Sequence, residues 1–233
     1  MARKRRKKYR LTKRNIICRP RDQGGLGVLE LEAQNKCLLS KWLYKLLNEE
    51  GMWQSMLRNK YFTNKTLSQV QVRPGDSQFW SGLMKVKAEF FQYGSFILKN
   101  GTQIRFWEDK WFGNTPLRDQ YPTLYNIVRR KNDTVAKVLA NENPALSFRR
   151  YLNGPNMHAW QSLNNRLSNI ILTDETDCFK WDLHQNGQFS VSSMYSTLIN
   201  THIIPNNPML WKIKVPLEVK FFLWLLYKKV ILT

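Results

Sequence analysis

The chain has 233 residues, of which 37 are Lys or Arg and 17 are Asp or Glu, so its formal net charge is +20. This excess predicts a polyanionic partner, with nucleic acid first and an anionic membrane surface second. Hydrophobic residues make up 42% of the chain, which suffices for a folded core, but the longest apolar run, at 221–227, is too short to cross a bilayer. We therefore expect no membrane-spanning segment and no membrane partner.

The positive charge is concentrated at the N-terminus. Eleven of the 37 basic residues lie within residues 1–21, which contain no acidic residue. The rest of the chain contains 26 basic and all 17 acidic residues. We predict that this basic arm binds nucleic acid through Arg3, Lys4, Arg5, Arg6, Lys7, Lys8, Arg10, Lys13 and Arg14. A solvated tail without specific contacts is the alternative. The run is also typical of nuclear import signals, and no secretory signal is present, so we expect a nuclear or cytoplasmic protein.

Helical periodicity dominates the first half of the body. Paired apolar residues four positions apart predict a helix over 32–48, with Gly51 ending it and a shorter helix over 52–61. A third helix is expected through Phe90, capped by Asp76 or Ser77. Its predicted inner face is formed by Phe79, Trp80, Leu83, Val86 and Phe90.

Two Asn-Gly pairs predict β-hairpins in the second half. Asn100-Gly101 separates two β-prone runs, and Asn186-Gly187 separates two more, with a helix capped by Ser192 after the second. Further helices are expected over 134–140, over 156–169 and from about Pro216, where a first-turn proline is tolerated. The predicted fold is α+β, mainly α-helical with two β-hairpins, and ends in a truncated domain because the last helix lacks a cap.

Candidate catalytic groups are sparse. The cluster Asp174, Glu175 and Asp177 has no evident carboxylate partner for a metal site, and it is interpreted as a polar turn. The three histidines are far apart and lie near no nucleophile signature. The cysteines Cys18, Cys37 and Cys178 have neither disulfide-framework nor zinc-ligand spacing. The residues thus predict no catalytic site, no metal, no cofactor and no enzyme activity for this chain.

A mixed aromatic and basic segment offers a second candidate contact. Arg105 and Lys110 stand among Phe106, Trp107 and Trp111, a combination that can stack and neutralise single-stranded nucleic acid. We predict Arg105 and Lys110 as nucleic-acid contacts, whereas the aromatic rings are interpreted mainly as core packing.

Four blocks of the sequence resemble a known family in the order in which the family carries them. They are the segments 7–47, 97–125, 179–199 and 210–233, which include CRPRDQGGLG, NGTQIRFWEDKWFGN and LWKIKVPLEVKFFLW. These blocks are similar to LINE-type (non-LTR) retrotransposon reverse transcriptases of the plant kind, downstream of the polymerase core and up to the start of the zinc-binding domain. The family's Tyr-x-Asp-Asp metal site is not in this chain, and its zinc-binding Cys and His residues are expected after Thr233.

The resemblance implies a domain order and a function. It divides the chain into a basic arm (1–21), a helical post-polymerase, thumb-like segment (22–93), a connector with two hairpins and helices (94–207) and the first helix of a truncated zinc-binding domain (208–233). It implies a non-catalytic fragment that binds RNA or DNA without sequence preference. The alternatives are a helical scaffold that binds a polymerase core or a second copy of itself, and a translated relic without function.

Overall fold

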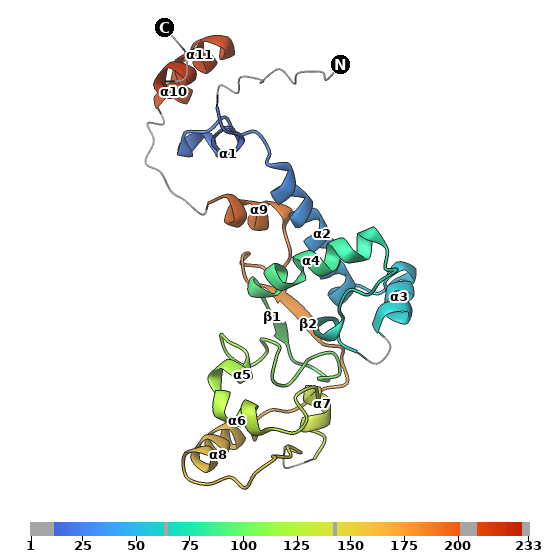
Figure 1. The fold of residues 1–233 in the computed structure, drawn as a ribbon. Coiled ribbons are helices and arrows are strands. Elements are labelled where there is room, and N and C mark those ends of the chain that lie inside the picture. The colour runs from blue at the N-terminus through green and yellow to red at the C-terminus, as the bar shows by residue number, and fades with distance from the viewer. Residues whose placement is uncertain (1–11, 63–64, 142–143, 201–208, 230–233) are drawn as a thin grey trace, which may run out of the picture. The chain divides into compact units, whose positions relative to one another are not determined.

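The computed structural model describes residues 12–62, 65–141, 144–200 and 209–229, and its chain divides into two compact units. Unit 1 comprises Met1–Cys37 and Met194–Thr233, and unit 2 comprises Leu38–Ser193. Two helices, α2 (Leu31–Asn48) and α9 (Val191–Ile199), run across the unit boundaries (Figure 1). The predicted arm residues Arg3, Lys4, Arg5, Arg6, Lys7, Lys8 and Arg10 lie outside the described residues.

The first helices of unit 2 lie where the periodicity predicts them, but Leu38 and Trp42 of the predicted apolar stripe are exposed. Leu43, Leu46 and Leu47 form the buried stripe of α2, and α3 (Met52–Leu57) follows Gly51 and continues into a π-helical turn (Arg58–Phe62). A single 3₁₀ turn (Leu67–Gln69) then leads toward α4.

The helix α4 (Gln78–Gln92) is capped as predicted, because the Ser77 hydroxyl accepts a hydrogen bond from the Trp80 N–H at 3.2 Å. Its residues Trp80, Leu83, Val86 and Phe90 are buried. The prediction that Phe79 lies on this inner face is wrong. Phe79 is exposed and instead contacts the rings of Trp42 and Trp53.

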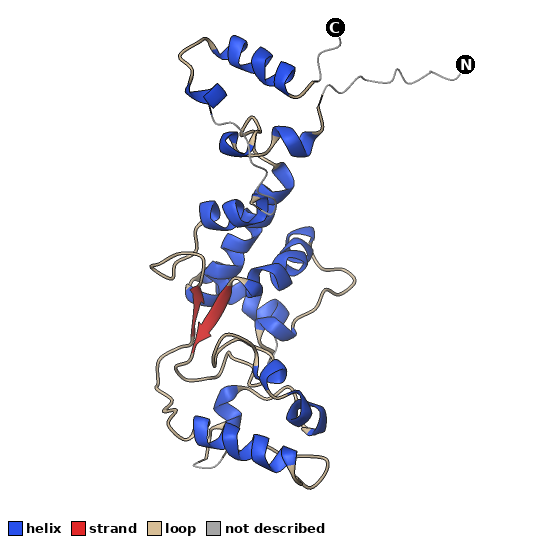
Figure 2. Ribbon diagram, turned by 90° about the vertical axis from the view of Figure 1, so that its left-hand side faces the viewer, coloured by secondary structure: helices blue, strands red, loops and turns tan. Residues whose placement is uncertain are grey.

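The sheet of unit 2 joins strands that the sequence assigned to separate hairpins. Strand β1 (Gly94–Ile97) pairs antiparallel with β2 (Cys178–Trp181), with Gly94 opposite Trp181 and Ile97 opposite Cys178. Figure 2 shows the two strands side by side. The mainly helical α+β class is confirmed, but the two predicted hairpins are wrong. Gly101 and Gly187 do turn the chain, at φ of 68° and 71°, yet neither turn joins two paired strands.

The Asn48 side chain extends this small sheet from the end of α2. Its Nδ2 donates to the Phe179 carbonyl at 3.0 Å, and its Oδ1 accepts from the Phe179 N–H at 2.8 Å. On this side β2 has no neighbouring strand among the residues that the structure describes, so the Asn48 amide takes the place of a backbone partner. The contact gives hydrogen-bond partners to both the N–H and the carbonyl of the buried Phe179.

Four helices, three of them short, complete unit 2 around a second apolar cluster. They are α5 (Leu117–Gln120), α6 (Pro122–Ile127), α7 (Val135–Val138) and α8 (Pro155–Leu167). The sequence predicted α7 and α8 but neither α5 nor α6. The cluster consists of Ile104, Phe106, Trp107, Leu117, Leu124, Val128, Val135, Val138, Leu163 and Leu167, all buried. The two strands lie between α4 and this helical group (Figure 1).

Unit 1 is built around a glycine loop and the last long helix. It contains α1 (Arg14–Ile17), a 3₁₀ turn (Arg21–Gln23), α10 (Met209–Lys212) and α11 (Leu217–Tyr227), which begins after Pro216 as predicted. Trp224 of α11 is buried, and its Nε1 donates to the Gly24 carbonyl at 2.9 Å. The loop requires Gly25, because a Cβ there would lie 2.0 Å from the Arg19 carbonyl oxygen.

Candidate nucleic-acid interface

Two of the predicted arm contacts, Lys13 and Arg14, fall within the described residues and lie at the start of α1. Lys13 precedes the helix as its N-cap, Arg14 is its first residue, and both side chains are exposed. Neither side chain forms an ion pair with a residue that the structure describes. Both are thus accessible to a phosphate, which their predicted role as nucleic-acid contacts requires.

Arg105 is not accessible, which corrects its assignment as a contact. Its side chain is fully buried, its Nε donates to the Thr66 hydroxyl at 3.1 Å, and its backbone N–H donates to Asp109 Oδ2 at 2.7 Å. Burial lowers the pKa of this guanidinium, while Glu108 and Asp109 act in the opposite direction. The alternation of Arg with aromatic residues at 105–111 therefore belongs to the interior of the fold.

Arg105 is one member of a buried polar network. Asp109 accepts from the Ser68 hydroxyl as well as from the Arg105 backbone. The Lys87 ammonium donates to the carbonyls of Leu67, Ser68 and Val70, the last at 2.6 Å. Burial raises the pKa of Asp109 from 3.8 to about 6 and lowers the pKa of Lys87. These contacts fix the loop before α4 against the segment after β1.

Lys110 is engaged within the protein. Its Nζ lies 2.6 Å from Asp182 Oδ2, and Asp182 Oδ1 in turn accepts from the Ser95 hydroxyl at 3.0 Å. The pair joins the segments that flank β1 and β2. Because its ammonium is already neutralised by a carboxylate, Lys110 is less suited to a phosphate than an unpaired cation.

The neighbouring aromatic residues serve the core, as the sequence favoured. Phe106 and Trp107 are fully buried, and the buried Trp111 donates from Nε1 to the Phe106 carbonyl at 2.9 Å. Phe112 lies at the surface beneath the Arg166 guanidinium, which is 4.6 Å from the ring centroid. Phe106, Trp107 and Trp111 therefore do not offer ring faces to nucleic-acid bases.

The acidic cluster performs a structural task. Asp177 is buried and accepts backbone N–H groups from Lys99 and Gly101 at 2.9 Å and from Gln103 at 3.0 Å. Glu175 pairs with the Lys99 side chain, which lowers the pKa of Glu175. No group of three or more potential metal ligands occurs within the described parts of the chain. The cluster is thus structural rather than catalytic in the described fold, and its Asp177 carboxylate organises the loop after β1.

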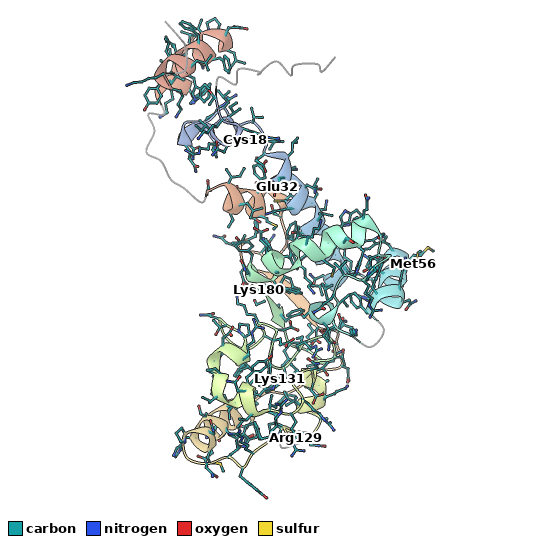
Figure 3. The ribbon with its side chains drawn as sticks, in the orientation of Figure 1. Cys18, Glu32, Met56, Arg129, Lys131 and Lys180 are labelled. Atoms are coloured by element: carbon teal, nitrogen blue, oxygen red, sulfur yellow. The ribbon has the colours of Figure 1, made fainter. Side chains whose placement is uncertain are left out.

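An exposed basic surface escaped the sequence reasoning. Arg129 and Arg130 follow α6, whereas Arg149 and Arg150 lie about 20 residues later, and an antiparallel bridge between Val128 and Phe148 brings the two doublets together. Arg129 and the neighbouring Lys131 are marked in Figure 3. Each doublet is visible in the sequence, but only the bridge makes them neighbours.

Comparison with known proteins gives one relative to report. The "Putative ribonuclease H protein" of Arabidopsis thaliana is 30% identical over 246 aligned residues, which cover 97% of this chain and 38% of that protein. The chain thus spans well under half the length of this relative. No family model matches the chain. No solved structure matches it.

The relative bears on two of the expectations. The similarity fits a retroelement-related protein concerned with nucleic acid, in agreement with the resemblance found in the sequence. It contradicts the expectation that the chain is not an enzyme, because the relative carries the name of an enzyme family. Separately, no helix among the described residues combines the length and apolar character needed to cross a membrane.

Proposed function

We propose that this chain is the part of a retroelement-derived protein that binds RNA or DNA without sequence preference, chiefly through its N-terminal arm. The observation that carries the proposal is the net charge of +20 with an acid-free segment at 1–21, in which Lys13 and Arg14 are exposed. Phosphate contacts by Lys and Arg release counterions and need no particular base sequence. The similarity to a ribonuclease H protein supports a nucleic-acid partner.

The four segments that resemble LINE-type reverse transcriptases support a more specific proposal for the origin of the chain. We infer a LINE-type element of the plant kind and the stretch between its polymerase core and its zinc-binding domain. The arm (1–21), thumb-like segment (22–93), connector (94–207) and entry helix (208–233) are the corresponding divisions. From the name of the relative we infer that the longer protein to which this chain belongs has ribonuclease activity. In that protein, this chain holds the nucleic-acid substrate.

Fluorescence anisotropy of the full chain tests the proposal. We expect similar affinities for single-stranded RNA oligonucleotides of unrelated sequence, and a steep loss of affinity as salt rises, because each phosphate contact contributes about 0.7 to the logarithmic salt slope. Replacing the nine predicted contact residues of the arm by Gln should lower both the affinity and the slope. Absence of binding at low salt would refute the proposal, as would a strong preference for one sequence.

A second candidate is self-association through α11. Leu217, Phe221, Phe222, Leu226 and Tyr227 on this helix are all exposed, and apolar surface of this kind is typical of an interface. Light scattering coupled to size exclusion should then give the mass of a dimer. The double variant Phe222→Ser/Leu226→Ser should return it to a monomer, whereas a monomeric wild-type chain would rule this candidate out.

A further inference from the structure

The two arginine doublets of unit 2 are held together by backbone hydrogen bonds. The Arg129 N–H donates to the Ser147 carbonyl and the Arg149 N–H donates to the Ile127 carbonyl, each at 2.8 Å, on either side of the Val128–Phe148 bridge. These are the contacts of a short antiparallel ladder. The doublets are therefore fixed relative to each other although about 20 residues separate them.

The same ladder sets the direction of the side chains. Val128 is fully buried, and the Phe148 ring packs edge-on against Trp160 of α8 at 5.5 Å, so both bridge residues face the interior. Neighbouring side chains in an extended segment point to the opposite face, and diagonal neighbours across an antiparallel pair lie about 7–8 Å apart. Arg129 and Arg149 are accordingly exposed on one outward surface. Arg130 and Arg150 follow the last hydrogen bonds of the ladder, so the alternation does not set their direction, and both are exposed as well.

Two further contacts order this surface. The Arg129 Nε donates to the Phe148 carbonyl at 3.0 Å, which orients the guanidinium along the ladder. Next to it, the Lys131 ammonium lies 4.2 Å from the centroid of the Tyr125 ring. Arginines tied to a backbone lose less conformational freedom on binding a phosphate than free side chains do.

The charge of this surface is not neutralised within the described part of the protein. Arg129, Arg130, Arg149 and Arg150 are all exposed, and no ion pair among the described residues includes any of them. The residue after the second doublet, Tyr151, is 95% exposed. A nearly fully exposed ring that directly follows an exposed arginine doublet in the chain is a combination that serves single strands, in which unpaired bases stack on aromatic side chains.

We propose that Arg129, Arg130, Arg149, Arg150 and Tyr151 form a second binding site, here named the arginine platform, for single-stranded nucleic acid. The guanidinium groups contact successive phosphates, for which their planar fork is suited, and Tyr151 stacks on a base. The inference rests on the proposed function but assigns part of the binding to unit 2, independently of the arm. An acidic peptide would use the charges alone and would gain nothing from Tyr151.

A charge-matched pair of variants tests the arginines. The platform variant is Arg130→Gln/Arg149→Gln/Arg150→Gln, and the control is Arg73→Gln/Lys85→Gln/Lys180→Gln, which removes the same charge from exposed positions elsewhere in unit 2. Anisotropy with a mixed-sequence single-stranded RNA, and in parallel a DNA, should show the logarithmic salt slope falling by about 2 in the platform variant only. Equal slopes in the two variants would overturn the proposal.

Tyr151 provides the second test. Tyr151→Ala should weaken binding of both single strands by about 5-fold or more and leave binding of duplex DNA unchanged, whereas Tyr151→Phe should bind as the wild type does, because the ring supplies the stacking. Unchanged single-strand affinity in Tyr151→Ala would refute stacking. Competition by poly-glutamate with equal effect on wild type and Tyr151→Ala would indicate an acidic-protein surface and overturn the assignment to nucleic acid.

The arm variant separates the two proposals. If the wild-type chain binds no nucleic acid at low salt, the proposed function fails. If it binds and Gln substitution of the nine predicted contact residues of the arm abolishes binding completely while the platform variant binds normally, the arm proposal holds and the arginine platform is refuted. Residual salt-dependent binding in the arm variant, lost on adding the three platform substitutions, is the result expected. Circular dichroism should show all variants folded.

Discussion

Asp177 shows how much of the fold a single carboxylate can hold. Its two oxygens accept three backbone N–H groups between Lys99 and Gln103, while its side chain is buried. Removal of the acceptor leaves these donors without partners in a site from which water is largely excluded, at about 1–3 kcal/mol for each group that stays unsatisfied. The loop after β1 therefore depends on a residue more than 70 positions away.

We predict that Asp177→Ala lowers the free energy of unfolding by about 3 kcal/mol, because the loop donors lose their acceptor. Asp177→Asn, which keeps one carbonyl oxygen, should lie between this variant and the wild type. Asp174→Ala is the matched control, since Asp174 is exposed, and should change stability by less than about 0.5 kcal/mol. Urea unfolding followed by tryptophan fluorescence measures all three, and equal effects at 174 and 177 would contradict the account.

Asp109 gives the protein a dependence on pH. Burial raises its pKa from 3.8 to about 6, so the folded state favours the protonated carboxyl. A raised folded-state pKa contributes stability that is complete below about pH 4 and is lost as pH rises through about 6. We predict a decrease of about 3 kcal/mol from this group between pH 4 and 7. Urea unfolding across that range should show the decrease in the wild type and a flatter profile in Asp109→Asn; parallel profiles would contradict it.

At the scale of elements, the β1–β2 pair depends on close backbone approach. Gly94 faces Trp181 in the register, and a Cβ at Gly94 would lie 2.4 Å from two Phe179 ring atoms and 2.8 Å from the Lys180 carbonyl oxygen. Phe179 is buried against Phe90, Phe91 and Phe96, so its ring has little room to move. Glycine is thus required here because the two strands leave no space for a Cβ.

Gly94→Ala and Gly82→Ala should therefore change stability in opposite directions. We predict that Gly94→Ala destabilises the protein by about 2 kcal/mol through overpacking. Gly82 lies inside α4, and a Cβ there would meet Leu39 Cδ1 at an ordinary 3.4 Å. The same added methyl should stabilise α4 by up to about 1 kcal/mol through helix propensity. Thermal melts by circular dichroism compare the two, and a shift of the same sign in both would contradict this explanation.

At the scale of the whole molecule, the division into two units predicts separate responses to core mutations. Trp224 is buried in unit 1 and bonds to Gly24, whereas Leu83 is buried in unit 2. We expect Trp224→Ala to accelerate amide hydrogen exchange in residues 12–30 and 209–229 and to leave β1 and β2 protected. Leu83→Ala should do the reverse. Uniform acceleration across both units in either variant would show a single cooperative structure instead.

Local signals in the sequence identified most helices correctly. Ser77 marked the start of α4 and Pro216 the start of α11, because caps and proline act through the backbone of the same few residues. The glycines of both Asn-Gly turns adopt the positive φ expected of them. The short helices α5 and α6 were not predicted, because neither begins with a capping side chain, whereas Thr134 caps the equally short α7.

The sequence by itself determined the charge of the protein, the accumulation of that charge at 1–21 and the positions of the long helices, because these properties reside in single residues or in neighbours along the chain. Only the tertiary structure decided that β1 pairs with β2, that Arg105 is buried and that Arg129 and Arg149 share a surface. Each of these depends on contacts between residues about 20 to 90 positions apart. The free energy of such contacts comes from packing and hydrogen bonds that no local pattern contains.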